Sequence, residues 1–356
     1  MEKSDHPMKI LIVKLSSIGD VVMATPTARV LREAFPDAYI AWVVERKSAD
    51  IVVGNPYLDE TIVWNRTSSH GWVRGVVRFS RHVRELKREL RDRHFDVALD
   101  LQGLLRSALI MHISGAKIRI GYKDAREFAP LLYTRRVQPN SDASIQQRHL
   151  DLLAPLGIQS NDVRMTIPIS DEERAFAIDL FKENQLSPEH TIAFCPSTSR
   201  TIKHWFNDHW ARLGDLLWQQ YGIRGLLLGS KADLPLVKDI KSRSAAPLVL
   251  AVGETSLKQA GALIEHCVAV VGVDTGLLHI GVAVDKPVVG LFGPHRWKSL
   301  VQKPNFVWLT KNFPCSPCRR KPTCENIDCM RAILPEDVIS ALSPWLPNHT
   351  KVGALD

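Results

Sequence analysis

The strongest constraint on the fold of this chain is a regular alternation of short, β-rich apolar runs with longer segments of helical periodicity. The first run covers residues 8–15, and a tight loop separates it from a helical pattern that extends to Phe35. The alternation continues through the first half of the chain, with apolar runs at residues 38–44, 60–64, 95–101 and 117–122. Short strands separated by segments long enough for helices predict a mostly parallel, doubly wound sheet.

The same alternation restarts after a polar, acidic stretch at residues 170–173. Strands are predicted there at residues 191–196, 225–229, 247–252, 268–273 and 287–292. Helices are predicted at residues 210–221, 234–242, 257–266 and 335–346. The 356 residues are about two and a half times the ~150 residues of a typical domain. We therefore predict an α/β protein with two Rossmann-like domains, residues 1–168 and 169–356, facing a central cleft that would hold the substrate.

The composition excludes several other classes of protein. Hydrophobic residues make up 45% and charged residues 24%, as in globular proteins, so long disordered or fibrous segments are not expected. Charged residues interrupt every apolar stretch before it reaches the ~20 residues of a membrane span. The first residues lack the apolar segment of a signal peptide, so a cytoplasmic location is expected.

The formal net charge of +8 predicts an anionic partner. Much of this charge lies between residues 66 and 93, where basic residues alternate with apolar ones at helical spacing. The basic residues are Arg74, Arg78, Arg81, Arg84, Lys87, Arg88 and Arg91. Such a segment is either the solvated face of a helix or a surface that docks on an anionic membrane. Nucleic acid is not expected as a partner, because aromatic residues are only 7% and no nucleic-acid-binding module is visible.

The loop after the first strand, residues 16–20 (SSIGD), has the composition of a catalytic turn. A carboxylate there can accept a proton from a hydroxyl group, and Gly19 allows a ligand to approach the backbone. We therefore take Asp20 as a candidate general base and Ser17 and Gly19 as candidate acceptor contacts. The alternative is an ordinary helix N-cap. The loop contains neither G-x-G-x-x-G nor a Walker A sequence, so it does not predict a dinucleotide site or a P-loop.

Residues 273–279 (VDTGLLH) follow a predicted strand in the second half. Asp274 and Thr275 stand where a helix begins, so free amides and the positive end of the helix dipole are available to a diphosphate. His279 follows one turn later. Capping with a partly buried histidine is the alternative, but the next predicted strand ends in Gly-Pro at the same sheet edge, which favours a ligand site.

A third loop, residues 196–205 (PSTSRTIKHW), follows the strand predicted at 191–196. Hydroxyl groups such as that of Ser197 suit a phosphate, and Lys203 would supply a point charge. Trp205 is expected to pack in the core. Taken alone, this loop does not distinguish a phosphate site from an ordinary polar loop.

Four cysteines are clustered near the end of the chain, and they are Cys315, Cys318, Cys324 and Cys329. In a reducing compartment such a cluster suits a structural zinc ion, or less readily an iron–sulfur centre, better than disulfides. The spacing is not that of a standard zinc ribbon, so a reduced structural cluster is the alternative. Cys195 and Cys267 lie in apolar segments and are expected to be packed.

Five segments together resemble the glycosyltransferase family of ADP-heptose:lipopolysaccharide heptosyltransferases. They are residues 12–20 (IVKLSSIGD), 100–107 (DLQGLLRS), 125–127 (ARE), 203–205 (KHW) and 274–279 (DTGLLH), and the resemblance covers nearly the whole chain. The third and fourth segments look most like heptosyltransferase I, which adds the first heptose to the Kdo of the inner core. The resemblance implies a GT-B fold, an inverting reaction, ADP-heptose as a substrate, and no required metal or other cofactor.

The resemblance also implies roles for single residues. Asp20 would be the general base on the acceptor hydroxyl. Lys203, Thr275 and Gly276 would hold the ADP diphosphate, and Asp274 and His279 would complete the donor loop. Where the family has a glutamate near the donor ribose, this chain has Asp233. The acceptor's carboxylates and phosphates would be contacted by Arg66, Arg126 and Arg148.

An acceptor built on lipid A and Kdo would sit in the inner membrane, so a peripheral location on its cytoplasmic face is expected. Inverting transfer needs a base on one side of the sugar and a stabilised diphosphate on the other, which closure of two domains would bring together. Three alternatives stay open: a transferase of another nucleotide sugar or acceptor, a nucleotide-sugar epimerase, and a basic nucleic-acid-binding protein with a cysteine metal knuckle. The oligomeric state does not follow from the sequence.

Overall fold

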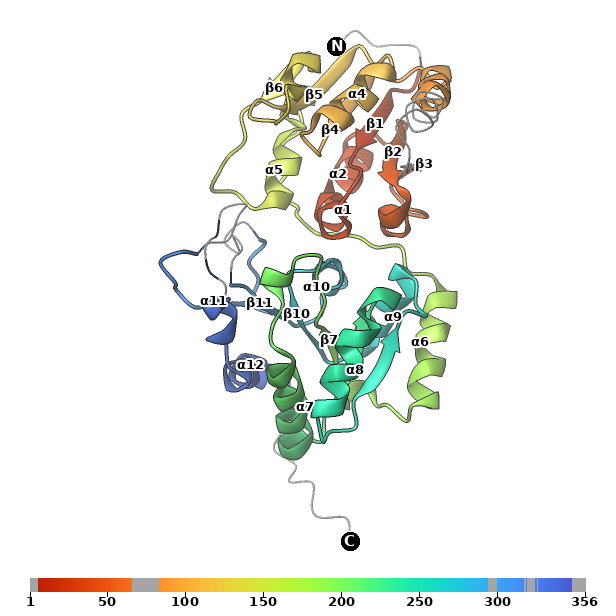
Figure 1. Ribbon diagram of the computed structural model, residues 1–356. Coiled ribbons are helices and arrows are strands. Elements are labelled where there is room, and N and C mark those ends of the chain that lie inside the picture. Colours follow the sequence, from red (N-terminus) through yellow and green to blue (C-terminus); the bar gives the residue numbers. More distant parts are fainter. Residues whose placement is uncertain are drawn as a thin grey trace, which may run out of the picture. The chain divides into compact units, whose positions relative to one another are not determined.

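The structure is a computed structural model, and it describes residues 6–65, 83–293, 300–316, 318, 324 and 326–347. The chain divides into two compact units, residues 1–168 (unit 1) and residues 169–356 (unit 2). In each unit the helices pack alongside the unit's own sheet (Figure 1). None of the helices in the described residues is long and apolar enough to cross a membrane.

Unit 1 is built on a parallel six-stranded sheet in the order β3-β2-β1-β4-β5-β6. This is the strand order of a Rossmann fold, with the switch point between β1 and β4. The strands are β1 (Lys9–Val13), β2 (Tyr39–Glu45), β3 (Glu60–Trp64), β4 (Val97–Asp100), β5 (Ile118–Tyr122) and β6 (Arg135–Val137). The sequence pattern predicted the first five of these strands. It missed β6, because this edge strand has three residues and largely exposed side chains.

The helices of unit 1 are α1 (Ile18–Ala24), α2 (Pro26–Ala34), α4 (Leu105–Ile113) and α5 (Ile145–Asp151), with shorter turns η1 (Arg46–Ile51), η2 (Ala129–Leu132) and η3 (Ala154–Leu156). Residues 83–92 are also helical. The single helix predicted up to Phe35 is two helices that meet at Thr25. Pro26 is the first residue of α2, a position where the missing N–H costs nothing.

Unit 2 repeats this arrangement with the order β12-β11-β10-β7-β8-β9, which is the same Rossmann order counted from β7. The strands are β7 (Thr191–Cys195), β8 (Arg224–Gly229), β9 (Val249–Val252), β10 (Ala269–Val273), β11 (Val288–Leu291) and β12 (Phe306–Leu309). The sequence pattern did not predict β12, the short strand at the edge of the sheet. The central strand β10 is fully buried, as expected for a sheet covered on both faces.

The longer helices of unit 2 are α6 (Asp171–Glu183), α7 (Asn207–Tyr221), α8 (Leu234–Arg243), α9 (Leu257–His266), α10 (Gly276–Ala283) and α12 (Pro335–Leu342). Shorter ones are η4 (Pro188–His190), η5 (Thr201–Lys203), η6 (Lys231–Asp233), α11 (Asp328–Arg331) and η8 (Ser343–Trp345). The acidic stretch that marked the domain boundary is the first turn of α6, where Ser170 and Glu173 form a capping box. The predicted last helix ends earlier, at Leu342, and packs against α7.

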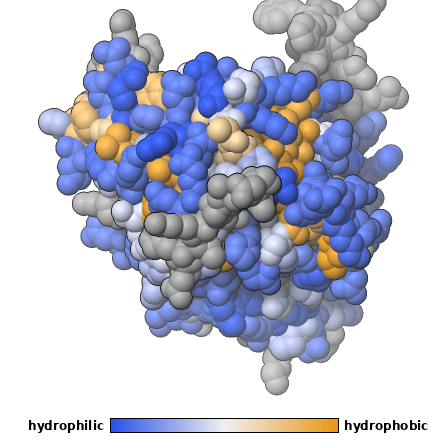
Figure 2. Space-filling view, turned by 90° about the horizontal axis from the view of Figure 1, so that it is seen from below, coloured by the Kyte–Doolittle hydropathy of each residue, from blue (hydrophilic) through white to orange (hydrophobic). Residues whose placement is uncertain are grey.

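Each unit has its own hydrophobic core. In unit 1 the core includes Leu11 and Val13 of β1 together with Leu86 and Leu90 of the helical residues 83–92. In unit 2 it includes Trp205, which is 2% exposed and confirms the expected packing of this side chain. The face in Figure 2 is mainly hydrophilic, with smaller apolar areas between the polar ones.

Candidate functional site

The loop between β1 and α1 holds Asp20 in a fixed orientation. Asp20 Oδ2 accepts hydrogen bonds from the backbone N–H of Ser17 (3.2 Å) and from Ser17 Oγ (2.9 Å), which forms a capping box at the start of α1. Asp20 is half-buried, Ser17 is exposed and Gly19 is buried. The capping alternative therefore describes a real contact, and the same contact would aim the carboxylate of a general base.

Two side chains support this loop, Gln102 from the loop after β4 and Arg106 from the first turn of α4. Gln102 Oε1 accepts from the backbone N–H groups of Leu15 and Ser16, both at 3.2 Å. Arg106 donates to Ser16 Oγ at 2.8 Å and to Glu45 at 2.9 Å. Neither residue was predicted to act at the site, although both lie in the segment 100–107 that carries the family resemblance. Their position after a strand of the same sheet edge was the available signal.

Beneath the loop lies a buried polar network around Lys14 and Asp100. Lys14 Nζ donates to the carbonyl of Leu101 at 3.1 Å, and burial lowers the pKa of this lysine although the charges of Asp20 and Asp100 raise it. The Asp100 carboxylate accepts from Tyr133 Oη (2.7 Å), Ser107 Oγ (2.9 Å) and two backbone amides. Burial raises the pKa of Asp100, and these hydrogen bonds lower it.

The predicted acceptor arginines have different surroundings. Arg148 belongs to α5, which contacts α1, and its guanidinium lies 5.8 Å from the centre of the Tyr122 ring and 3.8 Å from Asp124. Arg126 is exposed, and its backbone N–H donates to the carbonyl of Gly103 in the loop after β4 at 3.0 Å. Arg66 lies outside the described residues. Arg126 thus lies in the loop after β5, and Arg148 lies in a helix that contacts α1, the helix of Asp20.

In unit 2 the structure joins two of the predicted donor loops through one carboxylate. Asp274 Oδ2 forms an ion pair with Lys203 Nζ, and Asp274 Oδ1 lies 3.4 Å from His279 Nε2. The side chains of Lys203 and Asp274 are 15% and 12% exposed, and that of His279 is 6% exposed. Low exposure strengthens such a contact because solvent screens it less.

The start of α10 lies directly beside this cluster. Thr275 is the N-cap residue of α10 and Gly276 is its first residue, and both are half-buried. Thr198 Oγ1 donates to the Asp274 carbonyl at 2.9 Å, so this hydroxyl joins the loop after β7 to the loop after β10. Sequence reasoning selected the adjacent Ser197, which is 7% exposed, and missed Thr198. The arrangement combines a lysine cation with the free amides of a helix start, a combination that suits a diphosphate.

Asp233 is engaged within its own turn. Its Oδ2 accepts from the backbone N–H of Ser230 at 2.8 Å and from Ser230 Oγ at 2.7 Å. This capping box precedes η6 and α8, after β8. A contact of Asp233 with a donor ribose therefore stays a prediction.

The comparison with protein families decides the class of this chain. The family model of glycosyltransferase family 9 (heptosyltransferase) matches residues 83–327, which is more than half of the chain. The protein belongs to glycosyltransferase family 9. The predicted family and the predicted enzyme class, a glycosyltransferase, are thereby confirmed.

Individual relatives agree with this assignment. Lipopolysaccharide heptosyltransferase 1 of Pseudomonas aeruginosa is 28% identical over 332 residues, covering 89% of this chain and 87% of that protein. Lipopolysaccharide heptosyltransferase 3 of Escherichia coli K12 is 26% identical over 343 residues, covering 92% and 95%. The solved structure of E. coli ADP-heptose lps heptosyltransferase II superposes with a TM-score of 0.75 at 24% identity, covering 95% of this chain and 98% of that one. The predicted GT-B class of α/β fold is confirmed.

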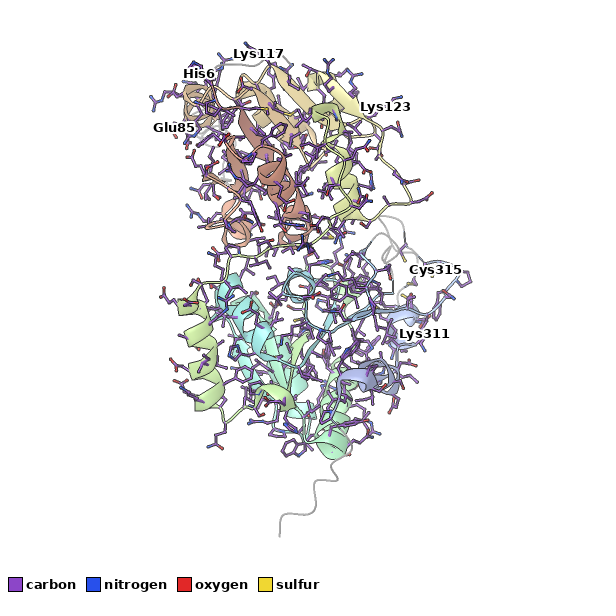
Figure 3. All side chains as sticks on the ribbon, turned by 180° about the vertical axis from the view of Figure 1, so that it is seen from behind. His6, Glu85, Lys117, Lys123, Lys311 and Cys315 are labelled. Carbon is purple, nitrogen blue, oxygen red and sulfur yellow. The ribbon has the colours of Figure 1, made fainter. Side chains whose placement is uncertain are left out.

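The four clustered cysteines do not form a metal site in the part of this family 9 enzyme that the structure describes. No group of three or more His, Cys, Asp or Glu side chains is arranged there to hold a metal ion. Cys315 is exposed at the outer edge of unit 2 (Figure 3), whereas Cys329 is buried in the core. Burial, together with the nearby Cys318, Cys324 and Cys315, raises the pKa of Cys329 to about 11. The predicted zinc site is therefore not supported.

Proposed function

We propose that this enzyme transfers heptose from ADP-L-glycero-β-D-manno-heptose to the Kdo of the lipopolysaccharide inner core, the step of a heptosyltransferase I. The observation that carries the proposal is the Lys203–Asp274–His279 cluster at the start of α10. A cation and free helix amides at one point are suited to a diphosphate leaving group. The curated relatives include lipopolysaccharide heptosyltransferases 1, 2 and 3, so the choice of the first step rests on residues 125–127 and 203–205.

On the donor side, Lys203, Thr275 and Gly276 would hold the ADP diphosphate. As the bond to the anomeric carbon breaks, negative charge grows on the diphosphate oxygens, where Lys203 and the first amides of α10 would stabilise it. Asp274 would keep Lys203 in place through their ion pair. Ser197 would add a hydroxyl, and Asp233 would contact the ribose.

On the acceptor side, Asp20 would accept the proton of the attacking hydroxyl. Its capping contacts with Ser17 would hold the carboxylate in position, and Ser17 and Gly19 would contact the acceptor. Attack on the face opposite the leaving diphosphate would invert the anomeric centre. Arg66, Arg126 and Arg148 would bind acceptor carboxylates and phosphates, because guanidinium groups pair well with such anions. No step of this scheme requires a metal.

The location proposed for the enzyme is the cytoplasmic face of the inner membrane, where a lipid A–Kdo acceptor would be anchored. Of the predicted basic segment, Arg74, Arg78 and Arg81 lie outside the described residues, and the exposed basic residues of the helix at 83–92 are consistent with attraction to an anionic surface. Leu86 and Leu90 of the same helix are buried in unit 1, so its charged face points to solvent.

Calorimetry with ADP, UDP and a duplex oligonucleotide at physiological salt tests the proposed donor class. The proposal expects ADP to bind most tightly and with little salt dependence. Preference for UDP would support the alternative of a transferase for another nucleotide sugar. Tight oligonucleotide binding that falls steeply with salt would support a nucleic-acid-binding protein instead.

A further inference from the structure

A group of apolar side chains is exposed on unit 1 beside the candidate acceptor site. Seven large apolar side chains of the described residues are strongly exposed, and four of these are Leu105, Leu109, Phe128 and Leu131. Phe128 is 80% and Leu131 is 73% exposed. Leu105 and Leu109 are 38% and 45% exposed and share one face of α4, because they are four residues apart. We call these four side chains the apolar tip.

The exposure of these side chains is not a result of loose packing, because the turn that carries two of them is firmly anchored. Within the same turn, Ala129 is fully buried and Tyr133 is 5% exposed, with its hydroxyl bound to Asp100. Arg119 also ties the turn to β5, because its Nε donates to the Leu132 carbonyl at 2.8 Å. The turn is therefore anchored on its inner side while Phe128 and Leu131 face solvent.

The α4 part of the tip is joined to the η2 part. α4 and η2 contact each other, and the backbone N–H of Leu105 donates to Glu127 Oε2 at 3.3 Å. Leu105 therefore lies next to the residue that precedes Phe128. The four side chains belong to one surface.

Charged residues flank the η2 part of the tip along the chain, and most of them are basic. Four exposed basic residues and two exposed acidic residues lie along the chain on either side of η2, and they are Lys123, Arg126, Arg135 and Arg136 against Asp124 and Glu127. Arg136 Nε donates to the carbonyl of Pro130 within η2 at 3.0 Å. Lys123 lies at the outer edge of unit 1 (Figure 3). Apolar side chains with a mainly basic rim are complementary to an anionic bilayer, in which apolar groups enter the interface and cations meet the headgroups.

The opposite end of α4 meets the basic helix. Arg91 Nε, in the helix at 83–92, donates to the carbonyl of Ile113 at the end of α4 at 3.3 Å. In Figure 1, α4 lies between this helix and the β6 side of unit 1. The apolar tip and the basic helix are thus connected through a single helix.

We propose that the apolar tip is the surface by which this enzyme docks on an anionic lipid bilayer. The proposal deepens the proposed function, on which the presence of a lipid-anchored acceptor rests. Arg106 follows Leu105 in α4 and donates to Ser16 in the loop of Asp20, so docking through the tip would bring that loop to the membrane surface. A protein partner is the less suitable occupant, because the tip has only four side chains, whereas each side of a stable protein interface contributes about 800 Å² and 20–30 residues.

Sedimentation with vesicles tests the proposal without any substrate. Wild-type enzyme should bind vesicles of phosphatidylethanolamine and phosphatidylglycerol, and the double variant Phe128→Ser/Leu131→Ser should bind them at least tenfold more weakly. The double variant Ile178→Ser/Leu334→Ser is the matched control, because these side chains of unit 2 are 40% and 49% exposed. It should bind as the wild type does. Lys123→Gln should weaken vesicle binding about fivefold.

Three results would overturn the docking surface. They are equal vesicle binding by wild type and Phe128→Ser/Leu131→Ser, no wild-type binding to the anionic vesicles, and a wild-type dimer in analytical ultracentrifugation that this variant converts to a monomer. Transfer to a soluble, deacylated acceptor, measured in parallel, separates this proposal from the proposed function. Vesicle binding that depends on the tip without any heptose transfer would contradict the function alone. Transfer with vesicle binding independent of the tip would contradict the docking surface alone.

Discussion

Lys203 and Asp274 form a largely buried ion pair in unit 2, although 71 residues separate them in the sequence. The pair joins the loop after β7 to the loop after β10, where His279 approaches the other carboxylate oxygen. One carboxylate thus fixes the lysine cation beside the first turn of α10. This relationship gives the proposed donor loop a fixed geometry and leads to the first prediction.

Lys203→Ala should weaken the binding of ADP and of the ADP-sugar and slow transfer. A diphosphate that loses a charge-assisted contact loses about 1.5–3 kcal/mol, which is roughly a ten- to hundredfold change in affinity. Isothermal titration calorimetry with ADP measures the effect. Lys303→Ala is the matched control, because Lys303 pairs with Asp285 elsewhere in unit 2. Equal ADP affinity of Lys203→Ala and the wild type would remove Lys203 from the donor site.

Asp20→Asn should lower turnover by roughly 10² to 10⁴ and leave ADP binding nearly unchanged, because the proposed general base is lost while the proposed donor site in unit 2 is unaltered. Steady-state kinetics and ADP titration measure the two quantities. Glu173→Gln is the control for capping, because Glu173 accepts from the backbone N–H and the hydroxyl of Ser170 just as Asp20 does from Ser17. Turnover of Asp20→Asn within about threefold of the wild type would reduce Asp20 to a cap.

His149 should make the stability of the enzyme depend on pH. This histidine is buried, Tyr122 Oη lies 2.6 Å from its Nδ1, and burial, with smaller effects of Lys14 and Arg148, lowers its pKa well below 6.5. The unfolded chain binds a proton below about pH 6.5 while the folded one stays neutral, so the free energy of unfolding should fall as the pH falls through this range. Above about pH 6.5 the unfolded chain is also neutral at this residue, so the loss of stability disappears.

Urea unfolding between pH 7.5 and pH 5 measures this effect as a difference from His149→Asn. Burial raises the pKa of Asp100, which changes stability with pH in the opposite direction. Only the difference between wild type and His149→Asn therefore isolates the effect of the histidine. Wild type should lose more stability on acidification than His149→Asn, by up to about 1.4 kcal/mol per pH unit. His112→Asn changes an exposed histidine of α4 and should behave as the wild type does. Parallel pH profiles of wild type and His149→Asn would contradict the prediction.

Tyr133→Phe should destabilise unit 1 by about 1–3 kcal/mol, because the buried carboxylate of Asp100 loses one of its donors. Urea unfolding measures the loss. Tyr57→Phe is a suitable control, because Tyr57 is only partly buried and lies in a different loop of the same unit. Equal stability of Tyr133→Phe and the wild type would mean that the network does not depend on this hydroxyl.

Removing four exposed charges from the helix at 83–92 should abolish sedimentation with anionic vesicles, and the substitutions to Gln are at Arg84, Lys87, Arg88 and Arg91. Each charge near the surface contributes about 1 kcal/mol, which salt screens over a Debye length of about 8 Å. Transfer to a membrane-embedded acceptor should slow, and transfer to a soluble acceptor should not. The control removes four exposed charges from unit 2, at Lys182, Arg212, Lys238 and Lys241. Equal slowing on both acceptors would instead place these residues in the sugar site or in the fold.

The sequence predicted the architecture because parallel strands in α/β sheets are continuous apolar runs with clear boundaries. The edge strand β6 escaped notice because its three residues are largely exposed, and the sequence pattern did not separate the half-buried edge strand β12 from the loops around it. The split at Thr25 was missed because α1 and α2 continue the same apolar periodicity on either side of Pro26.

For the candidate site, the sequence indicated the loops but not the contacts between them. Loops that follow parallel strands gather at the carboxyl edge of their sheet, so Asp20 in unit 1 and Asp274 in unit 2 could each be selected from its position. The pairing of Lys203 with Asp274 depends on side-chain geometry between distant loops, which no spacing encodes. The same limit applies to Tyr133, whose hydroxyl reaches Asp100 from 33 residues away. The cysteine cluster shows the converse, since its spacing suggested a metal site that the described residues do not form.

Mass spectrometry of acceptors incubated with the enzyme and ADP-heptose shows whether the enzyme adds the first heptose to Kdo. Two acceptors are compared, a truncated lipid A–Kdo and the same molecule already carrying its first heptose. We expect the lipid A–Kdo acceptor to gain one heptose and Asp20→Asn to abolish the gain. Addition only to the acceptor that already carries heptose, or no addition to either one, would contradict this expectation.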